Sequence, residues 1–415
     1  MAELIIRGGR PLDGKVEIQG AKNSALPILA ACVLTRGTCV LENVPRLTDV
    51  DASAAILRHL GASVSREGGT VTVAADIPDE LMRAMRSSIL FAGPLLARTG
   101  RAECCLPGGC ELGPRPVDLH LAALTALGAH VELRGGRLIC RGRLRGGEIR
   151  QNYPSVGATE NALMAAALAR GESVIFGAAR EPEIAELCDF LRGLGAKIAG
   201  GGTDTIRVSG AGALHGARHR VRADRIVTAT YLCAAAAAGG EGYLSGARAA
   251  ELGPVITTLR QAGAEISEEP GGIFIRAGCL RAPEPIVTAP YPGFPTDAQA
   301  PVMAALLRAK GKTEICETVF SARFSHVPEL RRLGASITVR GQTAHITGAD
   351  ALHGTHLRAE DLRGGAAAVV GALGAQGESC VTGVCHIDRG YEDIARDLTA
   401  LGASVTRAET AGHTI

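Results

Sequence analysis

The chain has 415 residues, 46% of them hydrophobic, which is more than one ordinary core accommodates and predicts at least two domains. Its net charge of only +2 argues against nucleic acid or a membrane surface as a partner, and 3% aromatic residues without Trp are too few to stack bases. No apolar run reaches the length of about 18 residues that spans a bilayer, and the first residues do not resemble a signal peptide. We therefore expect a cytoplasmic protein.

The cysteines indicate neither disulfides nor a metal site. There are 12 of them, none forms a C-x-x-C pair, and most lie in apolar runs, as Cys32, Cys233 and Cys316 do. In a long cytosolic chain such residues are small buried thiols. No cluster of His and Cys has the spacing of metal ligands, so the sequence predicts no metal and no cofactor.

The phrase Leu-x-x-Leu-Gly-Ala, or one near it, recurs six times along the chain, at intervals of about 70 residues, which is the mark of a duplicated structural unit. The copies occupy residues 57–62, 124–129, 191–196, 259–264, 330–335 and 398–403. Each predicts the end of an amphipathic helix with a glycine cap, followed by a strand, a turn and a second strand.

Upstream of each phrase, a second helix rich in Ala and Leu is predicted, so that each unit holds two helices and three or four strands. Six such units are too many for one core and predict two domains of three units each. The sixth unit ends near Thr406, too early to close its sheet. Residues 4–9 are apolar enough to supply the missing strand, which would place both termini in one domain.

Polar residues stand where the Ala-rich helices are expected to begin. Helix capping would explain a serine or an aspartate there, but a cation opposes the helix dipole. A helix N-terminus combined with a cation is suited to bind an anion, so these positions predict a site for negatively charged substrates. They are Lys22, Arg86, Ser155, Arg225, Asp297 and Arg363.

Eight further stretches are distinctive when taken together. They are GAKNSALP (20–27), LPGGCELGPRPVDLH (106–120), SVGAT (155–159), AREPE (179–183), FPTD (294–297), ETVF (317–320), DLR (361–363) and HIDRGYE (386–392). In order and over essentially the whole chain, these stretches resemble the UDP-N-acetylglucosamine 1-carboxyvinyltransferase family.

The resemblance implies an α/β (α+β) fold, a two-domain inside-out α/β barrel with six repeated units, three per domain, and the active site in the interdomain cleft. One domain is expected at residues 22–222, and the second at residues 1–21 plus 223–415.

The resemblance also implies the reaction. The family transfers the enolpyruvyl group of phosphoenolpyruvate to the 3-hydroxyl of UDP-N-acetylglucosamine and releases phosphate, the first committed step of peptidoglycan precursor synthesis, on which cell shape and division depend. By the same resemblance Lys22, Arg115 and Arg389 contact the phosphate of phosphoenolpyruvate. Arg323 and Arg363 hold its carboxylate, which the planar guanidinium group binds with two parallel hydrogen bonds.

The acid and the base of the reaction are expected at Cys110 and Asp297. In the family the cysteine of the Pro-Gly-Gly-Cys loop donates a proton to C3, its thiolate can also attack C2, and the epoxide fosfomycin alkylates it. Asp297 is expected to take the proton of the sugar hydroxyl, which Asn23 helps to orient. Glycines and prolines around Cys110 predict a mobile lid over residues 104–116.

The sugar nucleotide is expected to meet a longer set of residues. Backbone groups from Arg115 to Leu119 would read the uracil, and the helix beginning at 155–157 would take the diphosphate. The full expected set is Arg86, Arg115, Pro116, Val117, Asp118, Leu119, Ser155, Val156, Gly157, Asp297 and Val319. The chain departs from the family at Pro301, where Gln is common, and at Gly364, where Ala is commoner.

Three alternatives remain open on the sequence. The sister enzyme that makes enolpyruvyl-shikimate phosphate shares the fold and phosphoenolpyruvate, but Cys110 and the pair Lys22-Asn23 argue against it. A non-catalytic paralogue that only binds UDP-sugars would not need Cys110 and Asp297. A nucleic-acid-binding repeat protein is disfavoured by the near-neutral charge.

Overall fold

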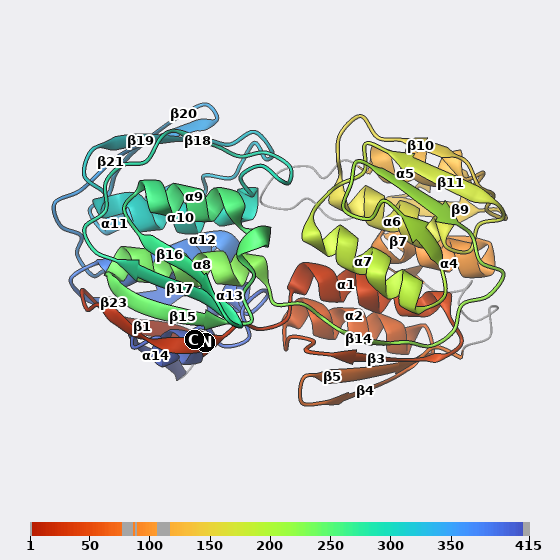
Figure 1. Cartoon of the computed structure of the whole chain (residues 1–415), viewed down its shortest axis with the longest axis horizontal. Helices are drawn as coiled ribbons and strands as arrows, with labels where there is room; N and C mark the ends of the chain where they lie inside the picture. Colours follow the sequence, from red (N-terminus) through yellow and green to blue (C-terminus); the bar gives the residue numbers. More distant parts are fainter. Residues whose placement is uncertain (1, 77–85, 88, 106–116, 410–415) are drawn as a thin grey trace. The chain divides into compact units, whose positions relative to one another are not determined.

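The chain forms two compact units, each with its own hydrophobic core. The computed structural model describes residues 2–76, 86–87, 89–105 and 117–409. Unit 1 contains residues 2–19 and 223–409, and unit 2 contains the described residues between 20 and 222. The chain thus enters unit 2 at Gly20 and returns to unit 1 at Ala223, close to the boundaries expected at residues 22 and 223. Figure 1 follows this path by colour.

The described strands form six four-stranded sheets built on one plan. In every sheet the first two strands are parallel, and the third and fourth are each antiparallel to their neighbour. Three sheets belong to each unit. The prediction of six repeated units, three per domain, is confirmed.

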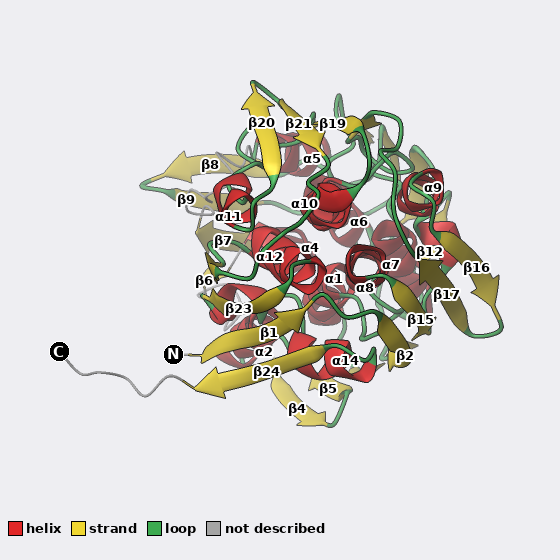
Figure 2. Ribbon diagram, turned by 90° about the vertical axis from the view of Figure 1, so that its left-hand side faces the viewer, coloured by secondary structure: helices red, strands yellow, loops and turns green. Residues whose placement is uncertain are grey.

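Unit 1 has its sheets in the following strand orders. They are β2 (Leu12–Glu17), β15 (Gly240–Ser245), β17 (Gly272–Ala277), β16 (Glu265–Glu269); β18 (Ile286–Val287), β19 (Lys312–Cys316), β21 (Thr343–Thr347), β20 (Ser336–Arg340); and β22 (His356–Arg358), β23 (Gly377–Thr382), β1 (Ala2–Gly8), β24 (Ser404–Glu409). The N-terminal strand β1 lies between β23 and β24, with Ile6 opposite both Ser379 and Val405. The predicted closure of the sixth unit by the other end of the chain is therefore confirmed (Figure 2).

Unit 2 repeats this plan within the described residues. Its sheets are β14 (Arg218–Arg220), β3 (Thr38–Glu42), β5 (Thr70–Ala74), β4 (Ser63–Glu67); β6 (Arg86–Ser87), β7 (Arg101–Cys105), β9 (Arg137–Arg141), β8 (His130–Arg134); and β10 (Glu148–Arg150), β11 (Glu172–Phe176), β13 (Thr205–Ser209), β12 (Lys197–Ala199).

Helices fill the interior of each unit. In unit 1, α8 (Arg225–Ala238), α10 (Thr296–Ala305) and α12 (Leu362–Gly374) pack against one another and are buried on almost every face (Figure 2). Their Ala-rich sequences are apolar all round, which suits a helix enclosed by other elements. The inside-out arrangement follows, since the helices form the core and the sheets cover them. The other α-helices described in unit 1 are α9 (Gly253–Gln261), α11 (Val327–Arg332), α13 (Val384–Ile387) and α14 (Ile394–Ala400).

Unit 2 has α1 (Lys22–Ala31), α4 (Ala92–Thr99) and α6 (Val156–Ala166) as its Ala- and Leu-rich helices, with α2 (Thr48–His59), α5 (Asp118–Ala126) and α7 (Pro182–Gly193) ending at the repeated phrase. Among the described residues no helix has both the length and the apolar character needed to cross a bilayer.

The glycine of the repeated phrase has the same backbone conformation in all six copies. Its φ is positive at each, in the left-handed region that favours glycine, so it reverses the chain after the helix and leads into the next strand. The predicted glycine caps are confirmed at Gly61, Gly128, Gly195, Gly263, Gly334 and Gly402.

Candidate functional site

Asp297 lies between two buried arginines of unit 1. One oxygen of its carboxylate accepts a hydrogen bond from Nη2 of Arg323 at 2.5 Å, and the other accepts one from Nη2 of Arg363 at 3.1 Å. The side chains of Arg323 and Arg363 are 4% and 6% exposed, whereas that of Asp297 is 29% exposed. The carboxylate is thus the most accessible of the three groups, and the two guanidinium groups lie deeper.

Three segments far apart in the sequence bring these side chains together. Asp297 is the second residue of α10 and Arg363 the second residue of α12, and these two helices are packed against each other. Arg323 lies in the segment between β19 and α11. Within that segment Glu317 accepts a hydrogen bond from Thr296 Oγ1 at 2.8 Å and another from the Val319 N–H at 2.8 Å. The buried Glu317 therefore ties this segment to the start of α10.

Burial and ion pairing have opposite effects on the charges of this cluster. Burial by itself would raise the pKa of Asp297, but the guanidinium groups of Arg363 and Arg323, with a smaller contribution from Arg225, outweigh burial and hold that pKa well below its usual range. Burial likewise opposes the charge of Arg363, yet the carboxylate of Asp297 raises the pKa of that guanidinium. At neutral pH Asp297 is therefore an ionised carboxylate and, in this state, a weak base.

The two arginines have more donors than Asp297 uses. Nε of Arg323 and Nη1 of Arg363 are buried, and neither has a hydrogen-bond partner among the described residues. Buried donors of this kind are costly unless something pairs with them. An anion that reaches the guanidinium groups would supply the missing acceptors.

Aspartates next to the arginines explain why cations are tolerated at helix N-termini. The side chain of Asp224 accepts hydrogen bonds from the N–H groups of Ile226 and Val227 at 2.8 and 3.1 Å at the start of α8. Asp361 accepts from Arg363 and Gly364 at 2.9 Å at the start of α12. Each cap places a negative charge at the helix end, which offsets the unfavourable effect of the helix dipole on the arginine beside it.

The expected capping roles are half right. Ser155 is the N-cap of α6 and accepts from the Ala158 N–H at 3.4 Å. Asp297 is not a cap, because the cap position of α10 is Pro295 and no side chain fills the role. Arg86 does not begin a helix either, since its backbone belongs to strand β6, before the short 3-10 helix Ile89–Phe91. Its side chain lies outside the described part of the structure.

Arg389 lies in a turn that two hydrogen bonds of Gln19 stabilise. The buried Gln19 donates from Nε2 to the carbonyl of Gly390 at 3.1 Å and accepts at Oε1 from the Glu392 N–H at 2.8 Å. The Arg389 side chain is exposed. Gln19 is a positioning residue that sequence reasoning missed. The only signal was its place directly before the recognised stretch at 20–27.

In unit 2 the predicted Lys22 is already paired with a carboxylate. It is the first residue of α1, it is buried, and its Nζ lies 2.7 Å from Oδ2 of Asp49 on α2. Asn23 follows it, partly buried. Pro27, four residues after Asn23, has no N–H to donate to the Asn23 carbonyl.

The same absence of a donor occurs in α10, where Pro301 stands four residues after Asp297. Pro301, where the family commonly has Gln, thus lies in the second turn of its helix. Gly364 has a local reason, because a Cβ there would lie 2.7 Å from Oδ2 of Asp361 and 2.9 Å from Cβ of His326.

Some of the residues expected to bind the nucleotide lie near the start of α6. Ser155, Val156 and Gly157 open this helix, and a Cβ on Gly157 would lie 3.1 Å from the ring of His120. His120 belongs to α5, which begins at Asp118, so Val117, Asp118 and Leu119 lie near the same helix end. The first N–H groups of a helix are donors for an anion such as a diphosphate. Burial lowers the pKa of His120 to about 4, so it is neutral at pH 7.

Part of the expected site cannot be located. Cys110, Arg115 and Pro116 lie outside the described residues, as does the expected lid from residue 106 onward. Val319 is described, and its N–H is bonded to Glu317. Sequence reasoning missed His326 and Tyr391, which are both buried. Burial lowers the pKa of His326, and the guanidinium group of Arg323 lowers it further. Burial raises the pKa of Tyr391, and the guanidinium group of Arg363 opposes this increase. Among the described residues, no three His, Cys, Asp or Glu side chains are grouped as a metal site requires.

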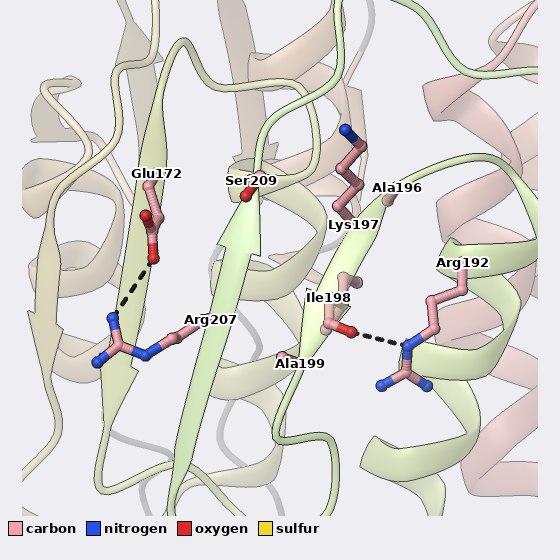
Figure 3. A pocket seen from close by; sticks show the side chains of 8 residues that line it. All are labelled: Glu172, Arg192, Ala196, Lys197, Ile198, Ala199, Arg207 and Ser209. Carbon is pink, nitrogen blue, oxygen red and sulfur yellow. Dashed lines mark hydrogen bonds and ion pairs between the residues drawn. The ribbon is translucent and has the colours of Figure 1, made fainter.

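A pocket on unit 2 does not coincide with these residues. It lies over β12, β13 and the end of α7, and contains the pair Glu172–Arg207 at 3.4 Å and a hydrogen bond of 2.9 Å from Arg192 to the carbonyl of Ile198 (Figure 3). None of the predicted site residues lines it. Its ion pair is exposed, and exposed ion pairs contribute little to the free energy of folding.

Comparison with known proteins agrees with the geometry. The model of the EPSP synthase (3-phosphoshikimate 1-carboxyvinyltransferase) family matches residues 6–398. A solved enolpyruvyl transferase, NikO from Streptomyces tendae, superposes with a TM-score of 0.86 at 26% identity over 98% of this chain and 99% of that one. EPSP synthase from Acinetobacter baumannii, at 19% identity and a TM-score of 0.74 over 99% of this chain and 100% of that one, shares the fold.

Curated relatives are more similar still. The chain is 46% identical to UDP-N-acetylglucosamine 1-carboxyvinyltransferase 2 of Caldanaerobacter subterraneus subsp. tengcongensis, over 98% of this chain and 100% of that protein. It is 47% identical to UDP-N-acetylglucosamine 1-carboxyvinyltransferase of Zymomonas mobilis, over 98% and 99%. The chain belongs to the enolpyruvyl transferase family, on its UDP-N-acetylglucosamine 1-carboxyvinyltransferase branch.

Proposed function

We propose that this enzyme transfers the enolpyruvyl group of phosphoenolpyruvate to the 3-hydroxyl of UDP-N-acetylglucosamine and releases phosphate. The observation that carries the proposal is the cluster of Arg323, Arg363 and Asp297. It combines two buried guanidinium groups, which suit a small carboxylate, with a carboxylate that can accept a proton. The names of the relatives on the same branch of the family support the choice of acceptor.

The reaction divides the roles between addition and elimination. In the addition, the sugar oxygen bonds to C2 of phosphoenolpyruvate, its proton passes to Asp297, and C3 receives a proton from Cys110. In the elimination, a proton passes from C3 to the Cys110 thiolate, the bond from C2 to the phosphate oxygen breaks, and the double bond between C2 and C3 is restored. Arg323 and Arg363 would hold the carboxylate throughout, and Lys22, Arg115 and Arg389 would neutralise the departing phosphate.

Residues of unit 2 would bind the sugar nucleotide. The N–H groups of Val156 and Gly157 at the start of α6, just after its N-cap Ser155, suit the diphosphate, and the chain from Val117 to Leu119 lies near that helix end. Asn23, next to Lys22, would orient the hydroxyl. The roles of Cys110, Arg115 and Pro116 rest on the resemblance of their sequence stretch alone, as does the contact of Arg86 with the sugar nucleotide.

In the cell, the proposed reaction would be cytoplasmic and would supply peptidoglycan precursors, and through them cell-wall growth, cell shape and division. Fosfomycin would alkylate Cys110, which intact-mass measurement of wild type and Cys110→Ser would test. An adduct on the wild type alone is expected. An adduct on the serine variant, or none on the wild type, would remove Cys110 from the proposal.

Phosphate release from phosphoenolpyruvate tests the proposed function. Wild type should release phosphate only when UDP-N-acetylglucosamine is present, and Asp297→Ala and Cys110→Ala should each lower the rate by roughly 100-fold or more. Asp189→Ala is the matched control, because Asp189 is also held by two arginines, at 2.6 and 2.7 Å, but on the exposed surface of unit 2. The absence of acceptor-dependent release by wild type would overturn the proposal.

A further inference from the structure

The arginine pair in unit 1 carries an unbalanced charge. Arg323 and Arg363 are two cations and Asp297 is one anion, so the cluster has a net charge of +1, and one further carboxylate would make it neutral. The donors for that carboxylate exist, because Nε of Arg323 and Nη1 of Arg363 are buried without a partner among the described residues. The group that now contacts the pair, Asp297, is also the more exposed one.

We propose that Asp297 occupies the arginine pair as an internal stand-in for the substrate carboxylate, and that the carboxylate of phosphoenolpyruvate displaces it. Binding of phosphoenolpyruvate would then release Asp297 from Arg323 and Arg363, and Asp297 would become an effective base only when the group to be attacked is in place. This inference rests on the proposed function, because it uses the same substrate and the same proton acceptor.

The physical reason is competition for the same donors. Each guanidinium group can bind a carboxylate through two parallel N–H bonds, but Asp297 receives only one bond from each arginine. A substrate carboxylate bound in the fork geometry would take over the Nη2 donors that Asp297 now holds. Displaced from both cations, Asp297 loses the interactions that keep its pKa low, and the pKa moves up toward and beyond its usual value.

Other ionisable groups around the pair change little in this exchange. They are Arg225 and Asp224 at the start of α8, Asp361 before α12, His326 before α11, and Tyr391. Burial lowers the pKa of His326 to about 4, and burial raises that of Tyr391, so both are neutral at pH 5–8. Asp224 and Asp361 are occupied as helix caps. Asp297 is therefore the group whose proton affinity the exchange changes.

Binding of two probes to the full-length protein tests the exchange. Phospholactate has the carboxylate and phosphate of phosphoenolpyruvate without its double bond, and ethyl phosphate lacks the carboxylate. Asp297→Asn should bind phospholactate more tightly than wild type, and the affinity ratio of phospholactate to ethyl phosphate should rise by about tenfold. An affinity ratio that is the same in Asp297→Asn and wild type would overturn the exchange. Asp189→Asn, the surface control, should not alter the ratio.

A measurement on wild type makes the test independent of the variant. Calorimetry in two buffers of different ionisation enthalpy gives the protons taken up when a probe binds. Phospholactate should cause more proton uptake than ethyl phosphate, and the difference should grow as the pH falls from 7 to 5, because the released Asp297 binds a proton more readily. Equal uptake for both probes at pH 5 would contradict the exchange.

Phosphate release in the same buffers separates the two proposals. Turnover of phosphoenolpyruvate with UDP-N-acetylglucosamine, combined with an unchanged affinity ratio and equal proton uptake, overturns the exchange and leaves the proposed function standing. Absence of both turnover and phospholactate binding overturns both proposals.

Discussion

The partly buried Asp297 in unit 1 and the buried Glu160 in unit 2 are two carboxyl groups with opposite properties. Arginines surround Asp297 and hold its pKa well below its usual range. Glu160, on α6, is 6% exposed, and burial together with the carboxylates of Glu183 and Glu181 raises its pKa well above its usual value. Burial acts in the same direction on both, so the charged neighbours decide the result. The difference shows that the neighbouring arginines, and not the degree of burial, keep Asp297 ionised in unit 1.

The largest loss of activity is expected at Arg363, one of the arginines that keep Asp297 ionised. In Arg363→Ala, kcat/KM for phosphoenolpyruvate should fall by roughly 1,000-fold, since a buried charge-assisted contact to the carboxylate is lost. Arg363→Lys should restore only part of this, because an ammonium group cannot bind the carboxylate through a fork. Steady-state phosphate release measures both. Arg358→Ala, at an exposed arginine at the end of β22 that lies 3.9 Å from Glu360, should leave kcat/KM unchanged.

The next largest effect is expected from a change in the packing beside Arg363. A Cβ at Gly364 would lie within 3 Å of Asp361 Oδ2 and of His326 Cβ, so Gly364→Ala should lower the free energy of unfolding by about 1–3 kcal/mol. Gly253→Ala is the control, because no atom lies within 4 Å of a Cβ there. Chemical denaturation compares the two. Equal stability of both variants would mean that the start of α12 yields at little cost.

The pH dependence of stability tests Glu160, the other carboxyl group of this comparison. A carboxyl group whose pKa is raised in the folded state stabilises fully below its unfolded pKa, and this contribution is lost as the pH rises through the folded pKa. Glu160→Gln should therefore be more stable than wild type at pH 8, by about 1–2 kcal/mol, and the advantage should vanish near pH 4.5. Unfolding at several pH values measures it. A variant less stable than wild type at pH 8 would show that Glu160 is ionised and paired.

The smallest expected effect is at the start of α6. Ser155→Ala removes the side-chain cap and should cost about 1 kcal/mol of stability, with a rise of a few-fold in KM for UDP-N-acetylglucosamine and little change in KM for phosphoenolpyruvate. Ser155→Asp keeps a capping acceptor, so it should retain most of the stability, but its charge should weaken binding of the diphosphate further. Loss of phosphoenolpyruvate affinity in Ser155→Ala would contradict the division of roles between α6 and α10.

The fold was predictable from the sequence because its signals are local and repeated. Each Leu-x-x-Leu-Gly-Ala phrase fixes a helix end through a glycine at positive φ, and six copies imply six similar sheets. The pairing of β1 with β24 was predictable because the last unit lacked a strand. The start of the second helix in the second unit was not, since Arg86 looks like its counterparts yet belongs to a strand.

The site was predictable only as a set of residue types. Nothing in the stretches around Asp297, Arg323 and Arg363 states that both oxygens of one carboxylate are taken by two arginines from other segments. The bonds of Gln19 to Gly390 and Glu392 join residues about 370 positions apart and have no local signal. Such contacts depend on how the helices and turns pack, which a pattern along the chain does not specify.

The central claim is that the buried arginines of unit 1 serve an enolpyruvyl transfer to a UDP-sugar. The most direct measurement compares phosphate release from phosphoenolpyruvate with two acceptors, UDP-N-acetylglucosamine and shikimate 3-phosphate, and identifies the product by NMR. The account predicts release with the UDP-sugar alone, and an enolpyruvyl ether on its 3-hydroxyl. Release with shikimate 3-phosphate alone, or with neither acceptor, would contradict it.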